Sequence, residues 1–126
     1  MKFFLAYSRA DRDYAASLAA EMERRGIRVF HDEAIFQPGA DWDGALRSAL
    51  EDSNATILVL PSEGAKGANN AIFEAGAAKA LGKKVLVVAR GAGDREFPNT
   101  IADMAIFNAG SKPLQEIADT LVRNAA

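Results

Sequence analysis

The sequence predicts an α/β fold in which a parallel sheet is covered by helices on both faces. Short apolar segments such as residues 55–60 and 84–89 have the composition of central strands, which are buried on both sides. Amphipathic segments with apolar residues at helical spacing separate these strands in the chain. This alternation indicates parallel pairing through right-handed crossovers.

The expected strands are short apolar runs bounded by polar residues, glycine or proline. The last of them is expected to be a short edge strand. The five strands are expected at residues 3–7, 27–31, 55–60, 84–89 and 104–107. Five strands in a chain of 126 residues predict a flavodoxin-like three-layer sandwich with the strand order 2-1-3-4-5.

The helices between the strands are predicted from their apolar stripes and their boundary residues. Asp11 is expected to cap the first helix, which Gly26 ends, and Asp41 is expected to cap the second. Gly82 closes a helix of small residues, and Pro113 stands in the first turn of the last helix. The four helices are expected at about residues 12–25, 42–50, 71–81 and 113–121.

Composition and charge place the chain among ordinary globular domains. Of its 126 residues, 49% are hydrophobic and 25% are charged, which excludes a disordered chain. A net charge of -2 offers no basic surface for nucleic acid, and no apolar run approaches the roughly 20 residues of a membrane span. The chain has no cysteine, which suits a reducing compartment. We therefore expect one cytoplasmic domain, residues 1–126, either alone or as part of a longer protein.

In a sheet of this order, ligands bind beyond the carboxyl ends of the strands, where the strand order reverses. The segments that follow the first three strands, residues 7–11, 32–41 and 61–74, are therefore the expected functional region. They hold no dinucleotide or Walker glycine motif, so no bound cofactor is expected. His31 is the only histidine of the chain, which leaves a zinc site or a Ser-His-Asp triad without support. No metal site is expected.

Five motifs along the chain resemble those of one family, and they occur in the same order. Phe4–Asp11 is similar to the family's first strand and the turn after it. Gly26–Asp32 resembles its second strand, and Pro38–Trp42 resembles the end of its BB loop. Ser53–Ser62 and Phe73–Val85 are similar to its third strand and to the glutamate-bearing helix before its fourth strand. By these motifs, nearly the whole chain resembles a TIR (Toll/interleukin-1 receptor) domain of the bacterial, NAD-cleaving type.

The resemblance implies one of two functions. Many TIR domains of bacteria, plants and axons hydrolyse or cyclise NAD⁺, which is their substrate and not a cofactor, and release nicotinamide in immune or cell-death signalling. Other TIR domains only self-associate and recruit partners. A glutamate distinguishes the catalytic members, and Glu74 stands at its position here. We therefore expect an NAD⁺ nucleosidase that acts in defence signalling, such as antiphage defence, and is activated by self-assembly into an oligomer or filament.

A single carboxylate is chemically sufficient for this reaction. Breaking the nicotinamide–ribose bond develops an oxocarbenium ion, which Glu74 would stabilise or capture. Nicotinamide leaves as a neutral molecule, so the general acid of other glycosidases is dispensable. The alternative is that Glu74 only interacts with the dipole of its helix, which favours acidic residues in the first turn. Against this, Glu74 lies one residue beyond the N3 position counted from an Asn70 cap, and its neighbours are apolar and small.

The resemblance also implies substrate contacts. Ser8 and Arg9 follow the first strand, where relatives contact the nucleotide, and Arg9 is expected to pair with the pyrophosphate unless this is only a solvated capping turn. Glu33 lies near a loop carboxylate that some relatives use on the adenosine side. Phe36 is expected to fold over the cleft or to pack against another subunit. Asn70 replaces the tryptophan of the best-known NAD-cleaving members and either caps its helix or contacts substrate.

Two other functions stay open at this point. A non-catalytic interaction module would use residues 32–41 and self-association. A nucleoside deoxyribosyltransferase-like enzyme would have a similar fold and a similar helix around Phe73–Gly76, although Tyr7–Asp11 fits TIR domains better. Release of nicotinamide from NAD⁺ would favour the nucleosidase, and release of base from deoxynucleosides would favour the transferase.

Overall fold

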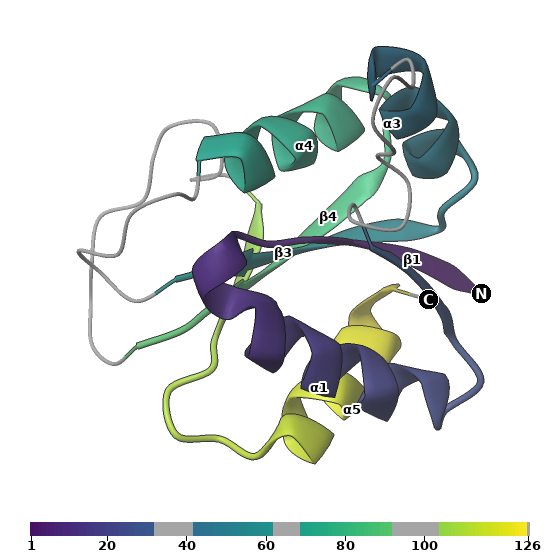
Figure 1. Ribbon diagram of the computed structural model, residues 1–126. Helices are drawn as coiled ribbons and strands as arrows, with labels where there is room; N and C mark the ends of the chain where they lie inside the picture. Colours follow the sequence, from purple (N-terminus) through teal and green to yellow (C-terminus); the bar gives the residue numbers. More distant parts are fainter. Residues whose placement is uncertain (32–41, 62–68, 92–103, 126) are drawn as a thin grey trace.

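A parallel sheet of five strands forms the central layer of the protein, with the order β2-β1-β3-β4-β5 (Figure 1). The strands are β1 (Lys2–Ala6), β2 (Arg28–His31), β3 (Ala55–Leu60), β4 (Lys84–Ala89) and β5 (Ala105–Asn108). The order is the one that the sequence predicts, and the last strand lies at an edge as expected. The computed structural model describes residues 1–31, 42–61, 69–91 and 104–125.

The central strand explains the apolar composition of its own segment. β3 pairs with β1 on one side and with β4 on the other, with Ile57 opposite both Leu5 and Leu86. All six residues of β3 are buried. A strand with helices on both faces has no solvent-facing positions, which is why its sequence shows no polar alternation.

Within the described residues, two long helices cover each face of the sheet, which gives three layers (Figure 1). The helices α1 (Arg12–Glu23) and α5 (Leu114–Ala125) lie together on one face, and a single 3-10 turn, η1 (Arg9–Asp11), leads into α1. The helices α3 (Trp42–Glu51) and α4 (Asn69–Ala80) lie on the other face. No helix in the described ranges combines the length and hydropathy needed to cross a membrane.

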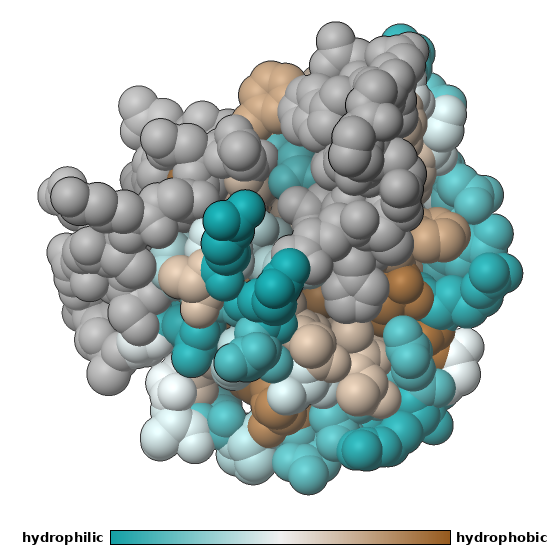
Figure 2. Space-filling view, in the orientation of Figure 1, coloured by the Kyte–Doolittle hydropathy of each residue, from teal (hydrophilic) through white to brown (hydrophobic). Residues whose placement is uncertain are grey.

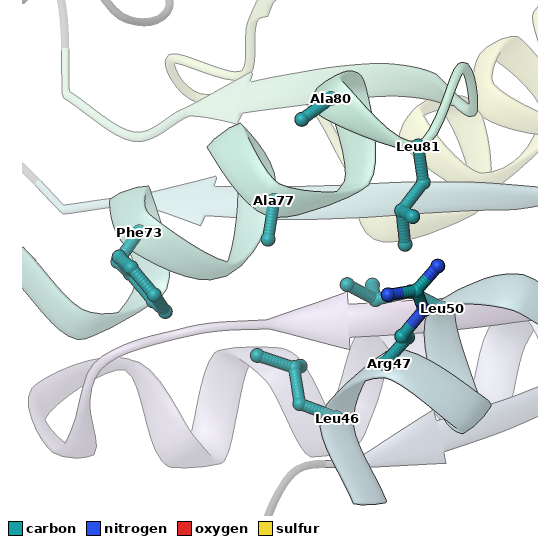
Figure 3. Close-up of a pocket in the computed structure, with 7 residues that line it drawn as sticks. All are labelled: Leu46, Arg47, Leu50, Phe73, Ala77, Ala80 and Leu81. Atoms are coloured by element: carbon teal, nitrogen blue, oxygen red, sulfur yellow. The ribbon is translucent and has the colours of Figure 1, made fainter. Parts of the chain in front are cut away.

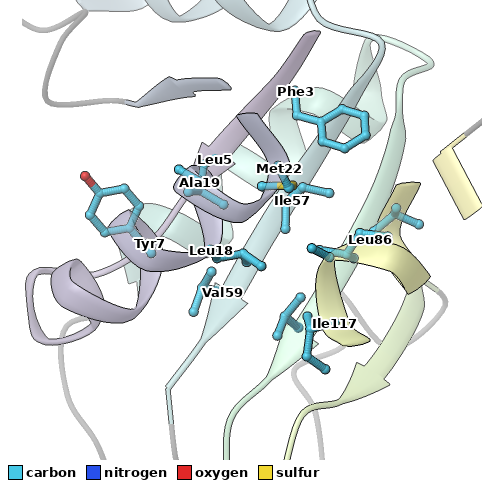
Figure 4. Packing of buried hydrophobic residues seen from close by; sticks show 14 of the residues in the cluster. Phe3, Leu5, Tyr7, Leu18, Ala19, Met22, Ile57, Val59, Leu86 and Ile117 are labelled. Carbon is cyan, nitrogen blue, oxygen red and sulfur yellow. The ribbon is translucent and has the colours of Figure 1, made fainter. Parts of the chain in front are cut away.

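Alternate residues of the strands face two separate cores. Phe3 and Leu5 of β1 pack with Leu18, Met22 and other residues under α1 and α5 (Figure 4). Phe4 points to the opposite side and joins the core under α3 and α4. This alternation follows from the two-residue period of a strand. In the space-filling view, hydrophilic side chains lie around smaller hydrophobic patches on the described part of one face (Figure 2).

Glycines end α1 and α4 in the way that the sequence predicts. Gly26 adopts φ 81° and its amide donates a hydrogen bond of 3.0 Å to the carbonyl of Glu23. Gly82 adopts φ 77° and donates to the carbonyl of Lys79 at 2.9 Å. Because this left-handed conformation favours glycine, both residues allow the chain to turn directly from a helix into the next strand.

Candidate functional site

The carboxyl edge of the sheet is where the sequence predicts the functional region. Among the described residues, this edge carries the turn after β1, the residue that follows β4, and the start of α4 (Figure 1). The expected contacts Glu33 and Phe36 fall in residues 32–41, outside the described residues. Of the other expected residues, Ser8 and Arg9 lie in the turn after β1, and Asn70 and Glu74 lie in the first half of α4.

Glu74 is almost completely buried, with 1% of its surface exposed. It is flanked on the inner side of α4 by Ala71, Ala75 and Ala78, all of which are buried in the core that α4 shares with the sheet. Small side chains on this side of the helix let its backbone approach the strands closely. A glutamate among them is held deep in an apolar layer, where an ionised carboxylate is costly unless its surroundings compensate the charge.

The helix dipole does not account for this position. The helix α4 begins at Asn69 and has no acidic residue in its first turn. Glu74 is the sixth residue of the helix. The favourable interaction of an acidic side chain with the helix dipole is confined to the first turn, so it does not extend to Glu74. A buried carboxylate next to a strand edge is typical of a functional site, because burial is how enzymes adapt the chemistry of acids and bases.

Asn70 lies inside α4 and does not precede it, because the helix begins at Asn69, two residues earlier than a cap at Asn70 requires. Residues four apart in a helix lie on the same face, one turn above the other. Asn70 stands one turn before Glu74 in α4. A position inside the helix does not fit the expected cap. A substrate contact by Asn70 stays a prediction, since its side chain is outside what the structure describes.

The turn after β1 is held together by its own side chains. The Ser8 hydroxyl is only 5% exposed and donates a hydrogen bond of 2.9 Å to Asp11 Oδ2. The Asp11 amide in turn donates to the Ser8 carbonyl at 2.9 Å. Arg9 lies between them with an exposed side chain. Of the two expected contacts in this turn, Arg9 is open to solvent and Ser8 faces inward.

Asp11 stands at the start of α1 as predicted, but its side chain does not cap the helix. The carboxylate, 3% exposed, is bound by Ser8 and by Arg90, whose Nη1 donates to Asp11 Oδ1 at 2.6 Å. Both oxygens therefore have partners from the edge of the sheet. The prediction of a side-chain cap was wrong because a charged arginine from a distant part of the chain is a stronger partner than the helix amides.

Arg90 is a residue of this edge that the sequence reasoning missed. It follows β4 directly, and its amide donates to the carbonyl of Leu60 at 2.9 Å. Its guanidinium carbon lies 4.3 Å from the centre of the Tyr14 ring, a cation–π distance. Burial raises the pKa of the Tyr14 phenol, and the nearby Arg90 guanidinium opposes that rise. Its position in the sequence could have indicated it, because Arg90 is a charged residue directly after a buried strand. The segments after the first three strands are predicted to be functional for the same reason.

The described groups reach the edge from opposite faces of the sheet. Glu74 belongs to the layer of α3 and α4, whereas Asp11 and Tyr14 belong to the turn and first helix on the α1 side. Only the ends of the strands separate the two layers there. Parallel α/β sheets bind their ligands beyond this edge of the strands.

An apolar groove lies between α3 and α4, on the outer side of α4. Figure 3 shows Leu46 from α3 and Phe73 and Ala77 from α4 pointing into it. Its volume is about 250 Å³, and Phe73 is 56% exposed. Glu74 is not among its lining residues, so this groove is separate from the strand edge. In the described part of the chain, no group of three or more His, Cys, Asp or Glu side chains could hold a metal ion.

Comparison with known proteins identifies the family. The family model described as TIR domain matches residues 3–122. A search of curated proteins gave no match. Among solved structures, the TIR domain of the Toll-related receptor TRR-2 from Hydra magnipapillata is similar, with a TM-score of 0.69 and 19% identity over 98% of this chain and 96% of that one.

Two enzymes of nucleoside chemistry have similar folds. The 2-deoxyribosyltransferase from Bacillus psychrosaccharolyticus matches with a TM-score of 0.70 and 16% identity, over 94% of this chain and 91% of that chain. The CMP N-glycosidase BcmB from Clostridium botulinum matches with a TM-score of 0.65 and 15% identity, over 97% and 99% of the two chains. At these identities the likeness concerns the fold alone. Together with the strand order and the ordered motifs, the match over residues 3–122 shows that the chain belongs to the TIR domain family.

Proposed function

We propose that this chain is an NAD⁺ nucleosidase in which Glu74 is the catalytic residue. The observation that carries the proposal is the burial of Glu74, which is 1% exposed, among the buried alanines of α4 that pack against the sheet. No feature of helix capping or of the helix dipole accounts for it. The TIR family includes NAD-cleaving enzymes that use a glutamate at this position, which supports the same assignment.

In the proposed reaction, the bond between the nicotinamide nitrogen and the ribose carbon breaks, and its electron pair leaves with neutral nicotinamide. Positive charge develops on the ribose, and the Glu74 carboxylate stabilises it or captures the carbon. Water then attacks this carbon and gives its proton to solvent, which yields ADP-ribose. Attack by a nucleophile of the same ADP-ribose would yield a cyclic product instead.

The remaining edge residues would bind the rest of the substrate. Arg9, which is exposed, would pair with the pyrophosphate, and the nearby backbone of Ser8 would contact the nucleotide. Asn70, one turn before Glu74 in α4, would contact the ribose or nicotinamide. Glu33 and Phe36 are proposed for the adenosine side and for covering the cleft. The proposed setting is cytoplasmic defence signalling, with self-assembly through TIR–TIR contacts as the activating step.

A non-catalytic interaction module is the second candidate. The exposed Phe73 beside the groove between α3 and α4 favours it, because a large aromatic side chain is costly to leave in water. The two functions make different demands on α4. Catalysis needs Glu74 on the inner side, and association would use the outer side.

The test is to incubate the whole chain with NAD⁺, with and without a crowding agent that promotes assembly. Chromatography would measure the nicotinamide that is released. Glu74→Gln keeps the shape of the side chain and should lower the rate by at least about a hundredfold. Glu116→Gln, an exposed position in α5, is the matched control and should leave the rate unchanged. Circular dichroism of each variant would establish that it is folded.

Each outcome separates the candidates. Equal rates for wild type and Glu74→Gln in the assembled state would exclude Glu74 as the catalyst. Self-association without nicotinamide release under any condition would favour the interaction module. Release of base from deoxynucleosides in place of NAD⁺ would favour a deoxyribosyltransferase-like activity.

A further inference from the structure

We infer that Arg90 is a positioning residue of the nucleotide site, which acts through Asp11 on the turn that carries Ser8 and Arg9. This inference rests on the proposed function, because it concerns the same strand edge and the same substrate. It adds a residue from β4 to a site that the sequence assigns only to segments after the first three strands. The contacts of Arg90 with Asp11, Tyr14 and Leu60 support it.

The β1–α1 turn depends on the Asp11 side chain for its shape. Asp11 Oδ2 accepts the Ser8 hydroxyl at 2.9 Å and Oδ1 accepts Arg90 Nη1 at 2.6 Å, so one carboxylate joins the turn to the end of β4. The Asp11 side chain is 3% exposed, and water cannot replace these partners at low cost. Loss of Arg90 would leave a buried carboxylate with one neutral partner, and the turn would rearrange to solvate it.

Arg90 itself is held in one place from three sides. Its backbone amide donates a hydrogen bond to the carbonyl of Leu60, which fixes the Arg90 backbone beside the end of β3. Its guanidinium lies over the Tyr14 ring at 4.3 Å, and Asp11 determines the direction of the charged end. A guanidinium stacked and paired in this way is preorganised, and a lysine cannot reproduce both contacts.

The consequence for binding is geometric. Arg9 is exposed and lies between Ser8 and Asp11, so the turn sets the position from which its side chain leaves the backbone. A cation held in the correct place before the substrate arrives binds its anion with a smaller loss of conformational entropy. Arg90 would therefore act on substrate affinity, whereas Glu74 acts on bond cleavage.

Arg25 offers a matched control at the opposite end of α1. It is also a partly buried arginine with carboxylate partners, at 3.2 Å from Glu21 Oε2 and 2.7 Å from Asp119 Oδ1. These contacts lie far from the strand edge, between the end of α1 and α5. Arg25→Met removes a comparable guanidinium at the end of α1 and should leave the β1–α1 turn unchanged.

The experiment has a structural and a functional measurement on the whole chain. The Asp11 amide hydrogen should exchange at least about tenfold faster in Arg90→Met than in wild type. In Arg25→Met its exchange rate should be unchanged. Steady-state NAD⁺ cleavage should show a KM raised about tenfold in Arg90→Met with kcat within about threefold. Arg90→Lys should recover part of the affinity, because it keeps the charge but loses the planar contact.

A double variant separates positioning from direct contact. If Arg90 acts through Asp11, Arg90→Met should raise KM no further in a chain that already carries Asp11→Asn. Additive effects on KM would mean that Arg90 touches the substrate itself, and they would overturn the inference. A wild-type KM in Arg90→Met would also overturn it while leaving the nucleosidase intact. A wild type that neither binds nor cleaves NAD⁺ would overturn the proposed function, and hydrogen exchange would still report whether Arg90 holds the turn.

Discussion

Asp11 and Arg90 form an ion pair of 2.6 Å although they are 79 positions apart in the chain. The carboxylate is 3% exposed and the guanidinium 35%, so one charge is deep and the other reaches solvent. The pair joins the start of α1 to the end of β4, across the end of the central strand β3. It is therefore a tertiary contact that fixes the position of a helix relative to the sheet.

Removing the cation from this pair should destabilise the fold. Arg90→Met leaves the Asp11 charge buried with one neutral hydrogen-bond donor, and we expect the free energy of unfolding to fall by about 2 kcal/mol. The exposed ion pair between Arg47 and Glu51 provides the control, and Arg47→Met should cost less than about 0.5 kcal/mol. Urea unfolding would measure both. Equal costs for the two substitutions would show that the Asp11 pair is no more than a surface contact.

The Tyr14 phenol should titrate above its ordinary pKa of 10.0, because burial disfavours its charged form. The folded pKa is raised, so the neutral phenol contributes fully to stability below the unfolded pKa, and this contribution is lost as pH rises through the folded pKa. Ultraviolet absorbance of the phenolate would follow the titration. Arg90→Met should move it to still higher pH, because the guanidinium lowers this pKa. A shift to lower pH would contradict the observed stacking, and Tyr14→Phe would identify the signal.

The pair between Arg25 and Asp119 should make stability depend on pH in the acid range. The hydrogen bond from Arg25 lowers the pKa of Asp119 below its ordinary value of 3.8. A folded pKa that is depressed contributes stability above the unfolded pKa, and this contribution is lost as pH falls through the folded pKa. Asp119→Asn should therefore lower the thermal midpoint at neutral pH, and the difference should shrink as pH falls below the ordinary pKa of 3.8 and through the lowered one.

The same substitution in an Arg25→Met background serves as the control for this prediction. With the guanidinium absent, Asp119→Asn should have the same small effect at every pH. High salt should also reduce the difference between wild type and Asp119→Asn, because both partners reach solvent and their attraction is screened. A difference that persists at low pH would assign the effect to packing.

Thr56 should be replaceable by valine without loss of stability. It lies in β3 with no exposed surface, and within the described ranges its hydroxyl has no hydrogen-bond partner. A buried hydroxyl without a partner costs free energy, and valine fills the same space with a methyl group. Thr56→Val should raise the free energy of unfolding by about 1 kcal/mol, measured by urea unfolding. Thr56→Ser, which keeps the hydroxyl and removes the methyl, should lower it by a similar amount. A loss of stability in Thr56→Val would mean that the hydroxyl has a partner in the folded chain.

Much of the fold could be predicted because its signals are local. The strand at residues 55–60 has the same bounds in the sequence prediction and in the structure, since its apolar run contains every residue that the sheet buries. Gly26 and Gly82 mark the ends of two helices for a reason confined to their own backbone angles. The strand order follows from the alternation of strands and helices, because right-handed crossovers leave few other arrangements.

The candidate site could be predicted only in part. Glu74 was identified from its helix and from a family resemblance, but its depth depends on how closely the alanines of α4 approach the sheet. The role of Asn70 depended on where α4 begins, and helix starts are the least certain feature of a sequence prediction. Local chemistry predicts a helix cap at Asp11, whereas in the structure its carboxylate is bound by an arginine from a distant part of the chain.

The order of the elements and the parallel sheet follow from periodicity and from residues that act within a few positions of themselves. That Ser8 faces inward, that Glu74 is buried, and that Arg90 reaches Asp11 are results of packing between distant parts of the chain. These contacts form between side chains from distant segments, which meet only when the layers pack. A local pattern in the sequence therefore cannot predict them.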